Sequence, residues 1–182
     1  MYRRCGKRAL DVLGATLLLL LAAPLLALAA LAVLLALGRP VLFRQERAGR
    51  GGQAFDVLKL RSMRDGPGDD AARLTRFGRA LRASALDELP QLWNVLRGEM
   101  SLVGPRPVIQ SELDRFYGAA AMHYMSVRPG ITGLWQVSGR SDTSYAQRVA
   151  LDVAYVSQAS IWQDIKILLR TPVAVLSRRG AC

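Results

Sequence analysis

The longest apolar run in the chain covers residues 12–37 and contains no charged residue. Its length exceeds the roughly 20 residues that an α-helix needs to span a bilayer. A cleaved signal peptide fits poorly, because its apolar region has only about 7–15 residues. A buried core helix also fits poorly, because a run this long without charge has no polar face. The pattern therefore predicts a membrane helix near the N-terminus.

Two further features bear on how this helix meets the membrane. Both of its flanks are strongly positive, although positive flanks prefer the cytoplasmic side. The flanking residues are Arg3, Arg4, Lys7 and Arg8 before the run and Arg39, Arg44, Arg47 and Arg50 after it. Pro24 lies near the middle, where it removes one helical hydrogen bond. A re-entrant helix that bends at Ala23 and Pro24 and returns to the same face satisfies both observations, with arms of about 12 residues, or roughly 18 Å. From the residues alone, a tilted span that tolerates the proline is equally acceptable.

The rest of the chain alternates short apolar runs with glycine-rich and polar segments. Runs at residues 41–43 and 55–60, separated by glycines within 48–52, predict a β-hairpin, and residues 64–71 predict a polar loop. Helices are expected at residues 74–83, 88–97, 109–125, 144–157 and 160–177. Residues 100–108 are expected to be irregular, and residues 128–140 non-helical apart from a short strand at 133–137. The predicted fold class is α+β and mostly helical, with a re-entrant membrane helix in residues 1–38 followed by a domain in residues 39–182.

Several predicted helices have wide apolar faces bordered by arginine or tryptophan. Trp93 and Trp162 lie on such helices, and Trp135 lies in the glycine-rich segment. Tryptophan and arginine favour the headgroup level of a membrane, so these faces are typical of amphipathic interfacial helices. The alternative is that these faces simply form the core of the domain, which is favoured for the helices after residue 108.

Composition changes this picture mainly through charge. The 182 residues carry a formal net charge of +11, which favours negatively charged partners: nucleic acid, anionic lipid headgroups or phosphorylated small molecules. Cys5 and Cys182 lie at opposite ends and have no disulfide or zinc-site spacing, which favours free thiols in a reducing compartment. His123 is the single histidine, which excludes schemes that need two.

The acidic pair Asp87 and Glu88 is the first candidate for chemistry. Pro90 suits the first turn of a helix, so Asp87 is a candidate N-cap of the helix at 88–97. The positive end of the helix dipole would keep that carboxylate ionised. An ionised carboxylate can act as a nucleophile or bind a hard cation such as magnesium. On local sequence alone, Asp87 could instead be only a cap and Glu88 only a first-turn acid.

Basic residues beside turns and loops favour a catalytic role of the acidic pair over a purely structural one. They are Lys59, Arg61, Arg82, Arg106 and Arg140. The planar fork of arginine suits phosphate oxygens, and glycine-rich backbone such as that at 130–139 can approach phosphate closely. A carboxylate pair, several cations and a membrane anchor together suggest metal-assisted phosphoryl transfer. For each arginine taken singly, a charge facing solvent or headgroups is the alternative.

Longer motifs connect these features to a known family. They are KRALD at 7–11, PVLFRQERAGRGGQAF at 40–55, KLRSM at 59–63, LDELPQLWNVLRGEMSLVGPRP at 86–107, RPGITGLWQVSGR at 128–140 and DIKILLR at 164–170. Over nearly its whole length the chain resembles the bacterial sugar transferases, which are monotopic polyprenyl-phosphate phosphoglycosyl transferases. It resembles their minimal catalytic form, without the additional N-terminal membrane helices of longer relatives.

The resemblance implies an enzyme of the bacterial inner membrane whose catalytic domain, residues 39–182, faces the cytoplasm. Such an enzyme transfers a phosphosugar from a UDP-sugar to polyprenyl (undecaprenyl) phosphate, releases UMP and begins glycoconjugate assembly at the membrane. Membrane lipids are expected partners, nucleic acid is not, and a homodimer is left open. The family typically has serine before the membrane proline, whereas this chain has Ala23, so the bend would depend on Pro24.

The resemblance also assigns roles to residues. Asp87 would be the nucleophile that forms a covalent phosphosugar intermediate, and it would bind the family cofactor Mg²⁺. Glu88 would be its acid–base or positioning partner. The phosphates or the nucleotide would be held by Arg82, Arg106 and Arg140, with Lys59 and Arg61 as further candidates.

Two other functions remain as alternatives at this stage. The same acidic pair could hydrolyse nucleotide diphosphate sugars with water as the acceptor. The positive charge could instead belong to a non-enzymatic module that binds anionic lipid or nucleic acid at a membrane surface.

Overall fold

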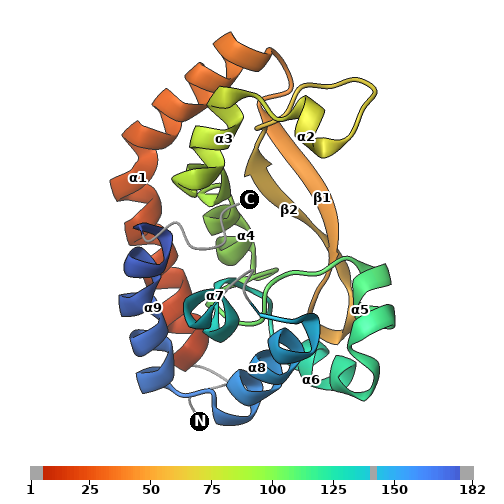
Figure 1. Ribbon diagram of the computed structural model, residues 1–182. Helices are drawn as coiled ribbons and strands as arrows, with labels where there is room; N and C mark the ends of the chain where they lie inside the picture. Colours follow the sequence, from red (N-terminus) through yellow and green to blue (C-terminus); the bar gives the residue numbers. More distant parts are fainter. Residues whose placement is uncertain (1–5, 140–142, 177–182) are drawn as a thin grey trace.

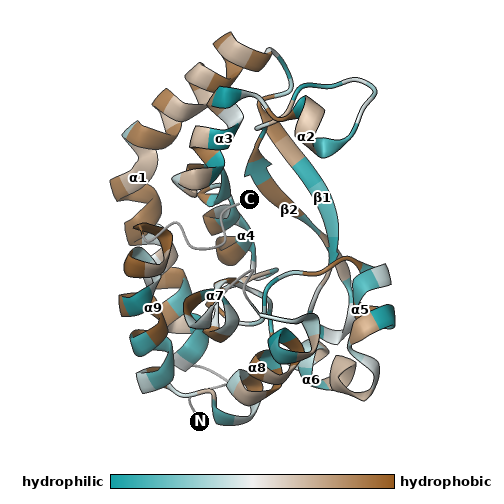
Figure 2. Ribbon diagram, in the orientation of Figure 1, coloured by the Kyte–Doolittle hydropathy of each residue, from teal (hydrophilic) through white to brown (hydrophobic). Residues whose placement is uncertain are grey.

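A computed structural model describes residues 6–139 and 143–176, and its N-terminal helix α1 (Lys7–Leu37) is continuous through Pro24 (Figure 1). Among the described residues, α1 is the one helix long and apolar enough to cross a membrane. Figure 1 shows it curving along one side of the molecule. Leu13, Leu21 and Leu35 are 72%, 70% and 79% exposed, and Figure 2 shows the helix as a nearly unbroken hydrophobic band. This surface is suited to lipid rather than to water.

Both ends of α1 pack against the same domain. In its N-terminal half Ala15 is fully buried in the main core, and in its C-terminal half Val33 is buried in a second cluster with Leu60 and Leu81. A straight membrane span would place its two flanks on opposite sides of the bilayer, whereas here one domain holds both ends. This arrangement favours the re-entrant topology, which stays a prediction.

The predicted hairpin is confirmed. Strands β1 (Leu42–Ala48) and β2 (Ala54–Leu60) are antiparallel and join through the 3₁₀ turn η2 (Arg50–Gly52) (Figure 1). Gly51 has a φ of 70° in this turn, a conformation that favours glycine because a side chain would clash with the backbone. The hairpin forms one side of the candidate site described below.

The remaining helices are short. They are α2 (Asp70–Arg73), α3 (Arg76–Ala83), α4 (Gln91–Arg97), α5 (Gln110–Phe116), α6 (Ala121–Met125), α7 (Leu134–Ser138), α8 (Tyr145–Gln158) and α9 (Ile161–Leu176). The helix expected at 109–125 is interrupted by the 3₁₀ turn η4 (Gly118–Ala120), where Gly118 has a φ of 47°. The strand expected at 133–137 is wrong, because α7 occupies that segment.

A small parallel ladder was not predicted. Strand β3 (Ser101–Val103) pairs with β4 (Gly130–Thr132). Gly104 lies against the backbone of Gly130, and an added Cβ on Gly130 would lie 2.1 Å from the nitrogen of Gly104. These glycines therefore allow two backbone segments of the quoted motifs to lie directly together.

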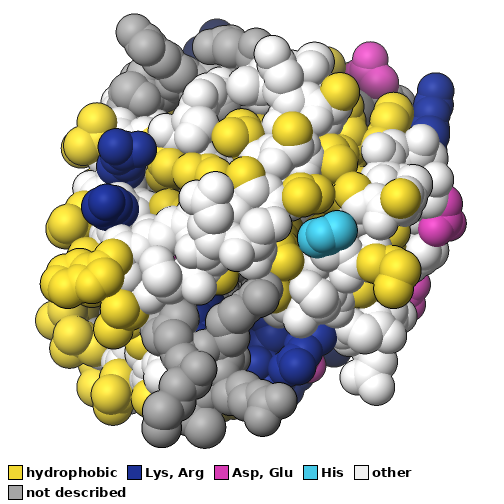
Figure 3. All heavy atoms as spheres, turned by 90° about the horizontal axis from the view of Figure 1, so that it is seen from below, with side chains coloured by type: hydrophobic (Ala, Val, Ile, Leu, Met, Phe, Trp, Pro, Cys, Tyr) yellow, Lys and Arg dark blue, Asp and Glu magenta, His cyan; other side chains and the backbone are white. Residues whose placement is uncertain are grey.

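The main core lies between α1, α4, β3, α8 and α9. Its buried residues include Leu92, Val95, Leu102, Tyr155 and Ile167. Helix α9 lies beside the N-terminal half of α1 (Figure 1), and its residues Trp162, Leu169 and Val173 are 71%, 72% and 68% exposed. Seen from below, hydrophobic side chains gather on this side of the molecule, with Lys and Arg side chains among them (Figure 3). The overall class is therefore α+β and mostly helical, as predicted, and α9 has the character expected of an interfacial helix.

Candidate active site

The acidic pair lies in the 3₁₀ turn η3 (Leu86–Glu88), between α3 and α4. Ala85, just before it, has φ 55° and ψ 15°, a left-handed conformation that costs a non-glycine residue roughly 1–2 kcal/mol. Helix α4 begins at Gln91 after Pro90, and no side chain caps it. The prediction that Asp87 is the N-cap is therefore wrong, because the 3₁₀ turn and Pro90 intervene. Its carboxylate is not occupied by a capping role.

Glu88 is held between two cations. Its Oε1 atom lies 3.0 Å from Lys59 Nζ on β2 and 3.4 Å from Arg106 Nη2 in the segment after β3. Burial alone would raise the pKa of Glu88, but Arg106 and Lys59 outweigh it and lower that pKa to about 2. Glu88 is therefore a fixed negative charge at neutral pH.

Asp87 has the opposite environment. Its side chain is buried, and burial first and the charge of Glu88 second raise its pKa to about 6, although Lys59 and Arg82 partly offset them. Among residues 6–139 and 143–176, no Lys or Arg nitrogen lies within 4.0 Å of its carboxylate oxygens. Asp87 is thus largely ionised near pH 7 yet poorly compensated, which suits a nucleophile or a cation ligand.

The surrounding scaffold is fixed by buried hydrogen bonds. Asn94, fully buried on α4, donates to the carbonyl oxygen of Asp56 and accepts from the backbone N–H of Leu58, so α4 is bound to β2. Arg8 on α1 donates to the carbonyl oxygens of Val95 and Leu96 at the end of α4. These contacts set the separation between Lys59 on β2 and Glu88 before α4.

A pocket opens beside Glu88. Its lining residues are Arg47, Val57, Lys59, Glu88, Gln91, Arg106, Pro107 and Ile131. Three of them are cationic, which favours an anionic group, although Lys59 and Arg106 face Glu88 and Arg47 lies 3.9 Å from Glu112. The volume of the pocket is about 20 Å³, room for about one water, so it is a small recess and a nucleotide would have to extend beyond it. Arg47 and Gln91 were not among the predicted site residues, although Arg47 stands within the motif at 40–55 and Gln91 within the motif at 86–107. Their positions within these motifs are the sequence feature that could have identified both as site residues.

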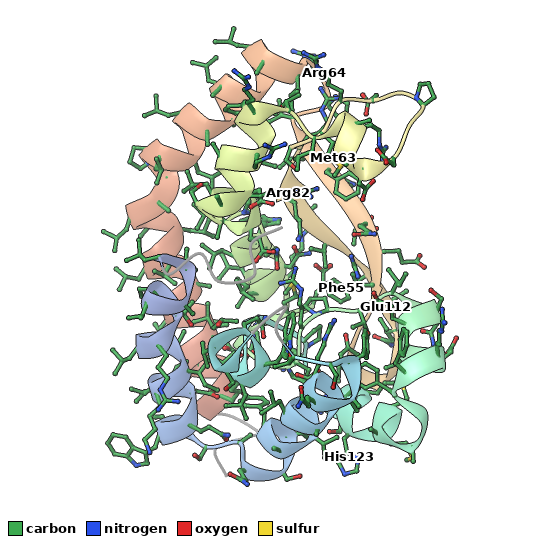
Figure 4. The ribbon with its side chains drawn as sticks, in the orientation of Figure 1. Phe55, Met63, Arg64, Arg82, Glu112 and His123 are labelled. Atoms are coloured by element: carbon green, nitrogen blue, oxygen red, sulfur yellow. The ribbon has the colours of Figure 1, made fainter. Side chains whose placement is uncertain are left out.

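The structure places the predicted basic residues in three different settings. Lys59 and Arg106 contact Glu88, as described above. Arg82 donates from Nε to Ser62 Oγ at 2.9 Å, and Figure 4 shows it between α3 and the hairpin, where its charge lowers the pKa of Asp87. Arg61 is buried away from the pair and donates to the carbonyl oxygens of Leu37 and Gly38 at the end of α1. Arg140 lies outside the described residues.

An aromatic platform adjoins the pocket. The Trp135 ring on α7 has the guanidinium of Arg106 6.0 Å from its centroid and that of Arg148 on α8 at 4.6 Å. Close to Arg148, Asp152 accepts a hydrogen bond from Tyr117 at 2.7 Å, and burial raises the pKa of Asp152 to about 6 despite Tyr117 and Arg148. Arg148 was not predicted. Its position beside Trp135 depends on the packing of α8 against α7, which the sequence pattern does not show.

The acidic pair offers one carboxylate to a magnesium ion. Within the described part of the chain, no group of three or more His, Cys, Asp or Glu side chains could hold a metal ion. Asp87 is the available carboxylate, because Glu88 already faces two cations. Magnesium is commonly held by one or two carboxylates together with substrate phosphates, and a cation would offset both causes that raise the pKa of Asp87. The residues present fit an ion shared with substrate rather than a protein-only cage.

The sequence is similar to known proteins over nearly its whole length. Residues 2–178 match the family model described as bacterial sugar transferase. The chain is 50% identical over 193 residues to a UDP-glucose:undecaprenyl-phosphate glucose-1-phosphate transferase of Caulobacter vibrioides, covering 96% of this chain and 71% of that protein. It is 43% identical to an exopolysaccharide production protein, ExoY, of Rhizobium meliloti, covering 97% of this chain and 88% of that protein.

A third relative is longer. The UDP-galactose-lipid carrier transferase of Erwinia amylovora is 45% identical, and the alignment covers 96% of this chain but 41% of that protein. Each of the three alignments covers at least 96% of this chain. The chain belongs to the bacterial sugar transferase family.

Proposed function

We propose that this protein transfers a phosphosugar from a UDP-sugar to undecaprenyl phosphate or a similar polyprenyl phosphate. The observation that carries the proposal is the division of the acidic pair. Glu88 is held ionised by Lys59 and Arg106, while Asp87 is buried, has no cation within ion-pair distance among the described residues and has a pKa of about 6. The names of the relatives, two of which specify an undecaprenyl-phosphate or lipid-carrier acceptor, support the same substrates.

In the first half-reaction an Asp87 oxygen attacks the sugar-bearing β-phosphorus of the donor. A new carboxylate–phosphorus bond forms, the bond from that phosphorus to the bridging oxygen breaks, and UMP leaves with the electron pair. Lys59, Arg106 and Arg47 around the pocket would hold the diphosphate and offset its charge. The chemistry that magnesium supplies when bound is further neutralisation of phosphate charge, with Asp87 as its protein ligand.

In the second half-reaction a phosphate oxygen of the polyprenyl phosphate attacks the same phosphorus. The bond to Asp87 breaks, the carboxylate is restored, and a polyprenyl-diphosphate sugar leaves. A covalent intermediate is useful here because the two polyanionic substrates would repel each other if they were bound together. In both steps Glu88 keeps Lys59 and Arg106 in place, which makes it a positioning residue in this scheme.

The proposed setting is the cytoplasmic face of a bacterial inner membrane. The exposed leucines of α1 and the exposed apolar residues of α9 support membrane attachment. The acceptor phosphate lies at the headgroup level, so the acidic pair must lie there as well. The pathway would be the assembly of exopolysaccharide or a related glycoconjugate, as the ExoY name suggests. A homodimer stays a prediction.

The test is UMP release by the purified full chain. UDP-glucose and UDP-galactose are assayed with and without undecaprenyl phosphate, and intact-mass spectrometry follows the protein after donor addition alone. The expected results are lipid-dependent turnover with at least one donor and a phosphosugar adduct on Asp87. Full multiple-turnover release without lipid would identify a hydrolase instead. Absence of turnover with every UDP-sugar, with membrane binding retained, would favour a non-enzymatic module.

A further inference from the structure

A second hollow lies at the C-terminal end of the membrane helix, away from the pocket beside Glu88. Its lining residues are Ala36, Arg64, Ala72, Thr75, Arg76 and Phe77. Its volume is about 420 Å³, room for about fourteen waters at roughly 30 Å³ each. A phosphate group with part of its hydration shell fits such a space. The proposed donor reaction makes no use of this hollow.

The walls of this hollow combine the two characters of a lipid phosphate. Ala36 belongs to the last turn of α1. It directly follows Leu35, which is 79% exposed and forms part of the apolar surface suited to lipid. Arg64 and Arg76 contribute two cations to the lining. An apolar chain could therefore lie along α1 while its anionic head group lies between the arginines.

These arginines are not neutralised by nearby acids. Of the three acids in the adjoining loop, Asp65 pairs with Arg61, Asp70 pairs with Arg73, and Asp69 caps α2 through the N–H of Ala72. Within the described ranges, neither Arg64 nor Arg76 takes part in an ion pair. The hollow therefore retains a positive charge that an anionic ligand would satisfy.

The positions of both arginines are fixed by backbone contacts. The N–H of Arg64 donates to the carbonyl oxygen of Arg73 at 3.0 Å, and the adjacent Met63 forms an antiparallel bridge with Leu74, so the loop is closed at its base. Helix α3 is packed so tightly against the strand end that a Cβ on Gly78 would lie 1.7 Å from the carbonyl oxygen of Ser62. The hollow is therefore a built feature of the fold.

A row of cations leads from the hollow to the acidic pair. Arg76, Arg79 and Arg82 recur at three-residue spacing and lie near one face of α3. Arg76 lines the hollow, and Arg82 acts on the charge of Asp87. The offset of six positions from Arg76 to Arg82 corresponds to about 9 Å along the helix axis. Figure 4 shows Arg64 near the end of α1 and Arg82 further into the molecule, at the two ends of this path.

We propose that this hollow is the docking site for the phosphate group of the acceptor lipid, and that the arginine row of α3 guides it to Asp87. The inference deepens the proposed function and rests on it. The lipid chain stays along α1, while the phosphate monoester passes from Arg64 and Arg76 towards Arg82. Donor binding occurs in the separate pocket beside Glu88, so the two polyanions approach Asp87 from different sides.

The test uses two double variants. The first, called the hollow variant, combines Arg64→Gln and Arg76→Gln, and its matched control combines Arg97→Gln and Arg115→Gln. The control also removes two arginines, each of which lies over an aromatic ring far from the hollow in sequence. Binding of undecaprenyl phosphate and of phosphatidylglycerol to each full-length protein in detergent is measured by native mass spectrometry. Kinetics add the KM for undecaprenyl phosphate and the single-turnover rate of UMP release from donor alone.

The hollow variant is expected to lose at least about tenfold in undecaprenyl phosphate affinity and to raise the KM for that lipid similarly, because two charge-assisted contacts are lost. The single-turnover release of UMP and the control variant should remain as in the native protein. Native-like lipid affinity and KM in the hollow variant would overturn the proposal. So would an equal loss of phosphatidylglycerol and undecaprenyl phosphate binding, which would identify a general anionic-lipid site.

Failure of the proposed function gives a different result. If the native protein releases no UMP from any donor, the binding measurement still decides whether the hollow recognises undecaprenyl phosphate. Should the double variant unfold at a lower temperature than the control, the single substitutions Arg64→Gln and Arg76→Gln replace it, each with an expected affinity loss of about threefold or more.

Discussion

The molecule contains two groups of buried carboxylates with opposite surroundings. In the first, Asp11 on α1 and Asp164 on α9 are both fully buried and lie on either side of Lys7, 3.4 and 2.7 Å from its Nζ atom. Asp11 also accepts hydrogen bonds from Ser101 Oγ at 2.9 Å and from the N–H of Leu102 at 3.0 Å. This cluster joins the membrane helix to β3 and α9, so its charges are used to hold elements together.

The second group is the acidic pair of η3. Glu88 has two cationic partners, but Asp87 has none within ion-pair distance in the described part of the chain. A buried carboxylate without a partner costs folding free energy, and folded proteins rarely retain one without a use. Within the described residues the two groups therefore differ in their cations: Asp11 and Asp164 share Lys7, although Asp11 Oδ2 has no hydrogen-bond partner, whereas the charge of Asp87 has no cation within ion-pair distance and is left for a ligand.

The largest effect is expected from Asp87→Asn. Turnover should fall by at least about 10³-fold, because the amide is not a nucleophile. Because burial raises the pKa of Asp87 to about 6 from its ordinary value of 3.8, removing its charge should also stabilise the fold by about 1–3 kcal/mol above pH 7. UMP release and thermal unfolding measure the two effects.

The matched control is Asp11→Asn in the first cluster. It also replaces a buried carboxylate by its amide, but it should destabilise the protein by about 1–3 kcal/mol and leave turnover per folded molecule nearly unchanged. If both substitutions destabilised the fold and spared turnover, the distinction between the two groups would be lost.

The next largest effect should come from Lys7→Met. It leaves Asp11 and Asp164 buried without their shared cation, which typically costs about 3–5 kcal/mol. The free energy of unfolding is measured by denaturant titration in detergent. The triple variant with both aspartates replaced by Asn should recover much of the loss, because no uncompensated charge then remains. A Lys7→Met protein as stable as the native one would show that this ion cluster is not structural.

Sequence predicted the features that depend on local pattern. Residues 12–37 predicted α1 because length and apolarity alone decide a membrane helix, and the glycines at 49, 51 and 52 predicted the hairpin turn. The β3–β4 ladder was not predicted, because three-residue strands are too short to show an alternation of apolar and polar residues. Its partners, such as Ser101 and Gly130, also stand in separate motifs far apart along the chain.

The candidate site was predictable in its members but not in its geometry. Lys59 and Glu88 are separated by 29 positions, and no spacing rule brings them to 3.0 Å. Their pairing depends on Asn94, which binds α4 to β2 through tertiary contacts. A position within a motif does not by itself predict a position in the site. Asp87 and Arg61 both stand in quoted motifs, but Asp87 lies in the acidic pair and Arg61 contacts the end of α1.

A smaller effect is expected from Arg61→Met, which tests that last contrast. Arg61 donates to the carbonyl oxygens of Leu37 and Gly38, so its loss should destabilise the protein by about 2 kcal/mol. The KM for the UDP-sugar should stay within about twofold, because the side chain does not face the pocket lined by Lys59. Arg61→Lys should not restore stability fully, since lysine lacks the planar fork. A large rise in donor KM would instead support the sequence-based prediction of substrate binding.

The pH dependence should separate activity from stability. Only ionised Asp87 is a nucleophile, so the rate of adduct formation should fall about tenfold per pH unit below its pKa of about 6. The raised pKa values of Asp87 and Asp152 act on stability with the opposite sign, because the folded state binds their protons more tightly than the unfolded state does. Stability from these groups is therefore present at low pH and lost as pH rises through about 6. Between pH 7 and pH 5, single-turnover rates should fall while the contribution of these two groups to the unfolding free energy rises.

The smallest and most specific effect concerns the acid limb of the pH–rate profile, the range below about pH 6 in which the rate of adduct formation falls. The pH of this limb should shift in opposite directions in two variants. The charge of Glu88 raises the pKa of Asp87, so Glu88→Gln should move the limb of single-turnover adduct formation to lower pH, by about one unit or less. The charge of Lys59 lowers that pKa, so Lys59→Met should move the limb to higher pH. Both substitutions disturb the same 3.0 Å ion pair, so a purely structural role for that pair would shift the limb in the same direction in both, or not at all. Opposite shifts, measured on the residual adduct formation of each variant, would mean that the titrating group is Asp87 and that its two neighbours set its charge.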